Sequence, residues 1–110
     1  APDPLQVEAS AEVGAQFVEL HTGSFAEQFA QEPDREDELE RLIAAARQAH
    51  KTGLQVNAGH GLNYHNLPRL HRVPHLVELN IGHSIVSRAV RTGLEAAVKD
   101  MLRLMENYSG

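Results

Sequence analysis

Three glycine-containing segments of this sequence place histidine close to carboxylate or amide residues. They are residues 19–23 (ELHTG), 57–61 (NAGHG) and 80–84 (NIGHS), and each ends a short apolar run typical of a β-strand. Glycine has no β-carbon, so a ligand can approach the backbone closely, and exposed N–H groups bind anions. Histidine gains or loses a proton near neutral pH. The combination indicates a site that holds phosphate groups and transfers protons.

The two later segments carry the anion-binding features. Gly59, Gly61 and Gly82 free the backbone, and a helix that begins near Ser84 would add the positive end of its dipole. His83 would either donate to a bound phosphate or cap that helix. A single such glycine is more often a plain turn residue, but two Gly–His pairs together favour an anion site.

The candidates for proton transfer are Glu19 and His60. Strand alternation puts Glu19 on the same face as Phe17 and His21. At the mouth of a barrel this carboxylate would be partly desolvated, which suits it to proton transfer or to stabilising a cation; on an open strand it would be an ordinary solvated carboxylate. His60 lies between two glycines, so its neighbours pack it poorly and leave it free to meet a ligand as acid or base. The histidines interpreted as surface or packing residues are His50, His65, His71 and His75.

The elements that position these residues alternate between helix and strand. Proline and capping signals predict a helix at about residues 3–14, and apolar spacing predicts another, capped by Asp34, that ends near Lys51. Residues 24–33 are interpreted as a loop with some helical character. The remaining predictions are strands at 16–21, 54–57 and 77–81, a helical turn at 67–70, a short helix at 85–90, and a last helix begun by Thr92 and Glu95 as a capping box. The glycine-rich residues 58–61 are predicted to end the second strand.

Alternation of this kind predicts an α/β fold with a parallel sheet and right-handed crossovers. Parallel strands have their C-terminal ends on one side, so the three segments should converge. In a TIM (β/α)₈ barrel that side holds the active site. The length of 110 residues predicts one small domain.

Composition argues against several classes of partner. The formal net charge of −5 supplies no basic field for nucleic acid or an anionic membrane. No apolar run approaches the roughly 18 residues that span a bilayer. Cysteine is absent, and the first ten residues have neither the basic nor the apolar region of a secretory signal. We therefore expect a cytoplasmic protein that binds neither nucleic acid nor membrane.

At the three strand ends the sequence resembles the pyridoxine 5′-phosphate synthase family of bacterial vitamin B6 biosynthesis. The matching runs are residues 19–23, 56–62 (VNAGHGL) with 64–66 (YHN), and 78–83 (ELNIGH) with 87–90 (SRAV) and 92–94 (TGL). The second and third are long and specific. The resemblance implies that residues 1–110 are the C-terminal part of a single TIM-barrel domain and supply about its last three strand–helix units.

The resemblance also implies an activity. The family condenses 1-deoxy-D-xylulose 5-phosphate with 3-amino-2-oxopropyl phosphate to give pyridoxine 5′-phosphate, inorganic phosphate and water, without a metal or organic cofactor, and assembles into oligomers, typically octamers. Glu19 matches its transition-state-stabilising glutamate and His60 its proton donor. The positions that match its aminooxopropyl phosphate site are Gly61, Gly82 and His83.

The chain departs from the family in lacking the motifs of its N-terminal half. That half carries an Asp–His pair, an arginine-rich segment with a catalytic histidine, and a second catalytic glutamate, none of which is present. Three strands cannot close an eight-stranded barrel. We therefore expect this chain to need the N-terminal half as a partner and to have negligible activity alone.

Two other functions fit the same residues. A metal-dependent TIM-barrel hydrolase could bind zinc through imidazole and carboxylate ligands, and the candidates are Glu19, His21, His60 and His83. Against it, the sequence has no compact ligand motif such as His-x-His or HExxH. The other alternative is a non-catalytic half-barrel interaction module.

Overall fold

The computed structural model describes residues 16–106, 108 and 109. The helix predicted at about residues 3–14 lies outside them. The elements in chain order are β1 (Phe17–His21), α2 (Gly23–Gln31), α3 (Asp37–Lys51), β2 (Gln55–Gly59), α4 (Leu67–Leu70), β3 (Leu76–Asn80), α5 (His83–Thr92) and α6 (Leu94–Met105). The predicted alternation of helix and strand is confirmed.

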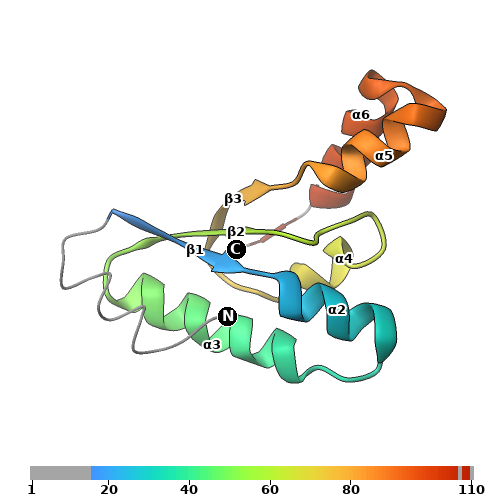
Figure 1. Ribbon diagram of the computed structural model, residues 1–110. Coiled ribbons are helices and arrows are strands. Elements are labelled where there is room, and N and C mark those ends of the chain that lie inside the picture. The colour runs from blue at the N-terminus through green and yellow to red at the C-terminus, as the bar shows by residue number, and fades with distance from the viewer. Residues whose placement is uncertain (1–15, 107, 110) are drawn as a thin grey trace.

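The three strands form one parallel sheet in the order β1-β2-β3 (Figure 1). Neighbours in the sheet are thus neighbours in sequence. In the register, His21 pairs with Gly59, and Gly59 pairs with Asn80, so the three strands end level with one another. The register shifts once, between Val56 and Asn57. This level edge carries all three segments picked out from the sequence.

One face of the sheet packs on helices and the other is polar. The buried side chains Leu20, Val56 and Ala58 meet the apolar faces of α2 and α3, which lie together on that side of the sheet (Figure 1). Burying one leucine or valine side chain contributes about 1.5–3 kcal/mol. The buried residues that α2 and α3 supply are Phe25, Leu39, Leu42, Ile43, Ala45, Ala46 and Ala49. The i, i+3, i+4 spacing of the α3 residues is why that stretch of chain folds as an amphipathic helix.

The prediction of a loop at residues 24–33 is wrong in its larger part, because α2 is a nine-residue helix. Phe25 anchors it in the core. The predicted Asp34 cap is also wrong. The helix α3 begins at Asp37, and a residue of α2 satisfies one of its free amides: Gln28 Oε1 accepts the Glu38 N–H at 3.1 Å. A capping contact across ten residues has no local sequence signature.

Strand β2 extends further than predicted, through Ala58 and Gly59. Glycine weakens an isolated strand, but here the two flanking strands hold both edges of β2, so pairing overrides local preference. The helical turn predicted at 67–70 is confirmed as α4, in which Leu67 and Leu70 are buried.

The helix α5 begins two residues before the prediction and ends two after it, at His83 and Thr92. The predicted Thr92–Glu95 capping box is wrong. Thr92 is the last residue of α5, and its hydroxyl donates to the Arg88 carbonyl at 3.2 Å instead of capping α6. Gly93, with φ +85°, makes the break between the two helices.

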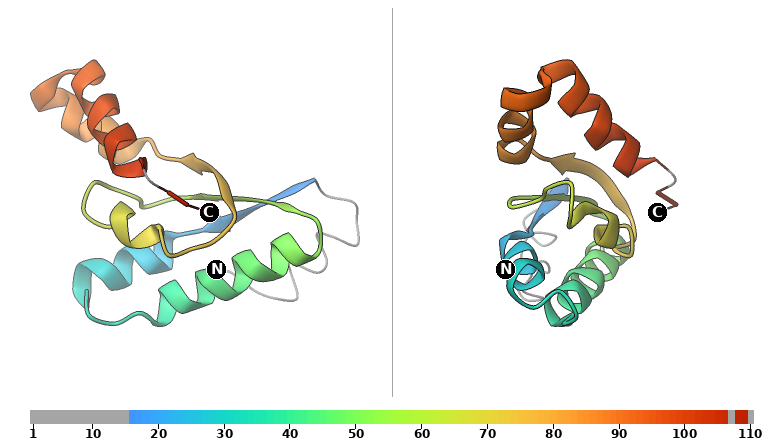
Figure 2. Two further views of the ribbon diagram at one scale, coloured as in Figure 1. Left: turned by 180° about the vertical axis from the view of Figure 1, so that it is seen from behind. Right: turned by 90° about the vertical axis from the view of Figure 1, so that its right-hand side faces the viewer.

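The α5–α6 hairpin projects from the C-terminal end of β3, away from α2 and α3 (Figure 2). Ala97 and Met101 of α6 are buried, but α5 buries no residue within the described chain. Five large apolar side chains of the two helices, here together called the hairpin strip, stay 37–84% exposed: Val86, Val90, Leu94, Val98 and Leu102.

Contacts of Tyr108 and His71 help to secure β3 and α6 to the rest of the fold. Tyr108 Oη donates to the Val73 carbonyl at 2.5 Å and accepts the Leu76 N–H at 2.8 Å. Burial raises the pKa of Tyr108. The ring of His71 meets Tyr108 edge-on, and its Nε2 lies 2.7 Å from the Leu104 carbonyl oxygen. His71 is therefore a packing residue, as predicted.

Candidate functional site

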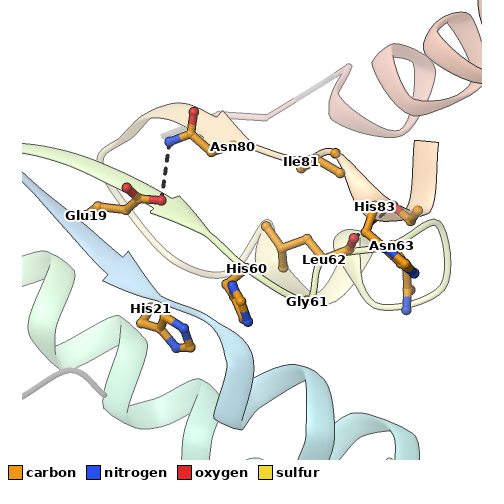
Figure 3. A pocket seen from close by; sticks show the side chains of 11 residues that line it. Glu19, His21, His60, Gly61, Leu62, Asn63, Asn80, Ile81 and His83 are labelled. Atoms are coloured by element: carbon orange, nitrogen blue, oxygen red, sulfur yellow. Dashed lines mark hydrogen bonds between the residues drawn. The ribbon is translucent and has the colours of Figure 1, made fainter. Parts of the chain in front are cut away.

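A cavity of about 820 Å³ lies at the C-terminal edge of the sheet. The five site residues predicted from the sequence all line it, and all but Gly82 are labelled in Figure 3. They lie in the strands, in the loops that follow them, or at the start of α5. The full lining is Glu19, His21, His60, Gly61, Leu62, Asn63, Asn80, Ile81, Gly82, His83 and Ser84. The expected convergence of the three segments is therefore found; the roles of the residues stay predictions.

Glu19 reaches across the sheet to Asn80. Asn80 Nδ2 donates to Glu19 Oε1 at 3.3 Å, although the strands that carry them lie on either side of β2 (Figure 3). Gly59 of β2 makes this possible, because a β-carbon there would lie 2.5 Å from Glu19 Oε1 and 3.0 Å from Asn80 Cβ. The missing side chain leaves the gap in which the carboxylate meets the amide. On the open face of this three-stranded sheet the Glu19 side chain is exposed, so the desolvation expected of it at the mouth of a closed barrel stays a prediction.

His60 is held in an unusual backbone conformation. Its φ is +92°, a region that side-chain-bearing residues seldom adopt. Thr22, which is fully buried, binds this part of the chain twice: its N–H donates to the Gly59 carbonyl at 2.9 Å and its hydroxyl to the His60 carbonyl at 2.6 Å. The end of β1 therefore fixes the backbone that carries the histidine. The sequence shows Thr22 as an ordinary strand-end residue, so it gave no signal of this contact.

We expect Thr22→Val to lower the free energy of unfolding by about 1–3 kcal/mol, because it leaves the His60 carbonyl without its buried donor. The measurement is the free energy of unfolding in denaturant. Thr52→Val is the matched control: its hydroxyl donates to the Ala49 carbonyl at the exposed end of α3, and we expect a loss under about 0.5 kcal/mol. Equal losses in the two variants would contradict a special role for Thr22.

Gly61 needs the absence of a side chain for two reasons. Its φ is +74°, and a β-carbon there would lie 2.8 Å from Ala26 Cβ. The loop therefore packs directly on α2. The buried amide of Asn66 also holds the loop, since its Nδ2 donates to the Gly61 carbonyl at 3.2 Å. The backbone of Gly61 is thereby presented to the cavity in one fixed orientation.

The third segment supplies a helix N-terminus. The first backbone hydrogen bond of α5 runs from Val86 N–H to the Gly82 carbonyl at 3.0 Å, which leaves the amides of His83 and Ser84 without a partner inside the helix. The hydroxyl of Ser84 donates to the Leu62 carbonyl at 2.9 Å and so joins this segment to the second one. Free amides at the start of a ten-residue helix, beside Gly82 and His83, form an arrangement that favours an anion.

Residues 16–106, 108 and 109 contain no set of ligands that would fit the alternative of a zinc hydrolase. No group of three or more His, Asp or Glu side chains in that part of the chain is arranged to hold a metal ion. Glu19 bonds to Asn80, and His21 bonds to a backbone amide. Over the same residues, no helix has the length and apolarity needed to cross a bilayer.

Comparison with known proteins gives a consistent family. The model of the family "Pyridoxal phosphate biosynthesis protein PdxJ" matches residues 1–107. The chain is 53% identical to the pyridoxine 5′-phosphate synthase of a Synechococcus species over 104 residues, which are 94% of this chain and 43% of that relative. It is 53% identical to the pyridoxine 5′-phosphate synthase of Akkermansia muciniphila over 109 residues, 98% of this chain and 44% of the relative.

The chain thus spans less than half the length of the curated relatives it matches. The family match covers the three strands, the helices between them and every residue that lines the cavity. The earlier resemblance is therefore confirmed, and the chain belongs to the PdxJ family of pyridoxal phosphate biosynthesis proteins.

Proposed function

We propose that this chain forms the C-terminal part of a pyridoxine 5′-phosphate synthase. The enzyme would join 1-deoxy-D-xylulose 5-phosphate to 3-amino-2-oxopropyl phosphate, forming pyridoxine 5′-phosphate and releasing phosphate and water. One observation carries the proposal: the five residues that match the family's site line a single cavity at the ends of three parallel strands. The names of the curated relatives support the same activity.

The proposed architecture is the last three strand–helix units of a TIM barrel, so residues 1–110 belong to one such domain. The sheet order follows the sequence order, and the helices of both crossovers, α2 and α3 in the first and α4 in the second, pack into one core cluster. A barrel has both features, whereas a doubly wound sheet carries helices on both faces. The open, polar face with Glu19, Asn57 and Asn80 would then line the barrel interior.

In this proposal, the phosphate of the aminooxopropyl substrate binds between the second and third segments. The amides at Gly61 and Gly82 and the start of α5 supply donors, and His83 adds its side chain. His60 gives a proton to the oxygen atom of the leaving group, since His60 lines the same cavity. Glu19 stabilises the cationic amine intermediates by its charge, held in place by Asn80.

The proposed partners are the two phosphorylated substrates, the N-terminal half of the barrel, and further copies of the complete synthase in a homo-oligomer. The exposure of the hairpin strip supports a contact with a partner there, because large exposed apolar surfaces mark contact sites. Location in the cytoplasm stays a prediction from the absence of cysteine.

We expect His83→Ala in the complete synthase to raise KM for 3-amino-2-oxopropyl phosphate by about 10- to 100-fold with little change in kcat, because one charge-assisted hydrogen bond to phosphate is lost. Steady-state formation of pyridoxine 5′-phosphate measures both constants. His65→Ala, an exposed histidine outside the cavity, is the control and should match the unsubstituted enzyme. A fall in kcat at unchanged KM would show that His83 serves the chemistry and not phosphate binding.

A further inference from the structure

The cavity holds two histidine rings in contact. His21 at the end of β1 stacks on His60 at the end of β2, with ring centroids 4.3 Å apart and an interplanar angle of 28° (Figure 3). Neither the family resemblance nor the proposed mechanism gives His21 a role. Both rings line the cavity, so the contact lies where the proton transfer is proposed.

His21 is itself fixed in place. Its Nδ1 accepts the Gly23 N–H at 3.3 Å. Because a backbone amide can only donate, this nitrogen carries no proton in the contact, and the neutral ring has its hydrogen on Nε2. The strand end and the first residue of α2 thus hold the ring from two sides.

Gly23 also provides the space for the pair. A β-carbon at Gly23 would lie 2.6 Å from His21 Cε1 and 3.3 Å from His60 Cδ2. Both rings therefore lie over a glycine, the one residue type that leaves room for them. Gly23 has no positive φ, so the space for the rings, and not backbone strain, is what its missing side chain supplies.

Different contacts hold the ring and the backbone of His60. Thr22 holds the His60 carbonyl, whereas the His60 ring itself stacks on His21. Aromatic stacking of this kind restricts the ring to few orientations. A proton donor works only when its ring meets the reacting atom in the right geometry.

We propose that His21 is a positioning residue: its ring holds the His60 imidazole in the orientation needed for proton transfer. The missing side chain of Gly23 leaves the space that both rings need. The inference rests on the proposed role of His60. It predicts that loss of the flat ring at position 21 lowers kcat and leaves KM for both substrates unchanged.

The test compares His21→Leu with His21→Phe in the complete synthase. The leucine removes the flat ring and should lower kcat about tenfold, the upper end of what a stacked aromatic pair contributes. The phenylalanine keeps a flat ring and should stay within about threefold of the unsubstituted enzyme. His50→Ala is the matched control, since His50 stacks on His75 at 3.7 Å outside the cavity; kcat should not change. A rise in KM at constant kcat would overturn the proposal, because His21 would then bind substrate directly.

A double variant separates positioning from direct catalysis. If His21 acts through His60, adding His21→Leu to His60→Ala has no further effect on kcat. A second full loss in the double variant would overturn the proposal. Gly23→Ala gives an independent check: alanine suits a helix better than glycine, so stability should be kept, while kcat should fall as in His21→Leu because the rings are displaced.

The imidazole NMR shifts of His60 test the inference without relying on turnover. In the unsubstituted synthase we expect the shifts of one fixed ring, and in His21→Leu averaged shifts like those of free histidine. Unchanged shifts in His21→Leu would refute the positioning role. Absence of pyridoxine 5′-phosphate formation by the unsubstituted complete protein would instead refute the proposed function, and the shifts would still decide the role of His21.

Discussion

Replacing His60 by alanine in the complete synthase will lower kcat by about 10²- to 10⁴-fold, the usual contribution of a general acid. KM should change little, because the phosphate donors are assigned to Gly61, Gly82 and His83, which the substitution leaves in place. The assay is steady-state formation of pyridoxine 5′-phosphate, with His65→Ala as the control for removal of an exposed loop histidine.

The backbone must be checked in the same variant, since His60 has φ +92°. Alanine adopts that conformation no more easily than histidine, so a change of loop shape has to be separated from the loss of the imidazole. His60→Gly relieves the strain and still removes the ring. Equal losses of kcat in His60→Ala and His60→Gly would assign the effect to the imidazole; recovery of activity with glycine would contradict its role as proton donor.

Residues 1–110 on their own will show no measurable synthase turnover. Within the described residues, the face of the sheet that carries Glu19 and Asn80 is open, and the hairpin strip has no cover. A reaction that needs water excluded and substrates held from several sides cannot proceed at an open edge. The measurement is turnover by the purified segment at high protein concentration; any formation of pyridoxine 5′-phosphate above the rate without protein would contradict the prediction.

The same material should self-associate through the hairpin strip, because uncovered apolar rows drive contact between copies. Sedimentation velocity would show this. Val90 is the most exposed large apolar residue in the described chain, at 84%, so Val90→Glu should reduce association. Val73→Glu is no substitute, since Val73 is buried in the core and its replacement would unfold the segment.

The elements with strong periodicity could be predicted from sequence, and some of their boundaries could not. The helix α3 and the strands β1 and β3 follow from apolar spacing, because each turns apolar side chains toward the same core, although those of β3 are only partly buried. The start of α3 depends on Gln28, and the extension of β2 through Gly59 depends on the strands beside it. Both are contacts between elements, and local sequence carries no record of them.

In the site, too, some features could be predicted from sequence and others could not. Glu19, His60 and His83 could be placed together because parallel strands bring their C-terminal ends to one edge, whatever the side chains. The residues that hold them could not be predicted. Thr22, which follows β1, binds the His60 carbonyl after β2, and Asn80 reaches Glu19 across Gly59. These pairings depend on strand register, which spacing alone does not fix.

A crystal structure of the complete synthase with inorganic phosphate tests the central claim most directly. We predict phosphate in the cavity at the ends of β1, β2 and β3, within hydrogen-bond distance of backbone amides at Gly61 and Gly82 and of the His83 side chain. Phosphate bound only at another part of the molecule, with these amides turned away from it, would contradict the account.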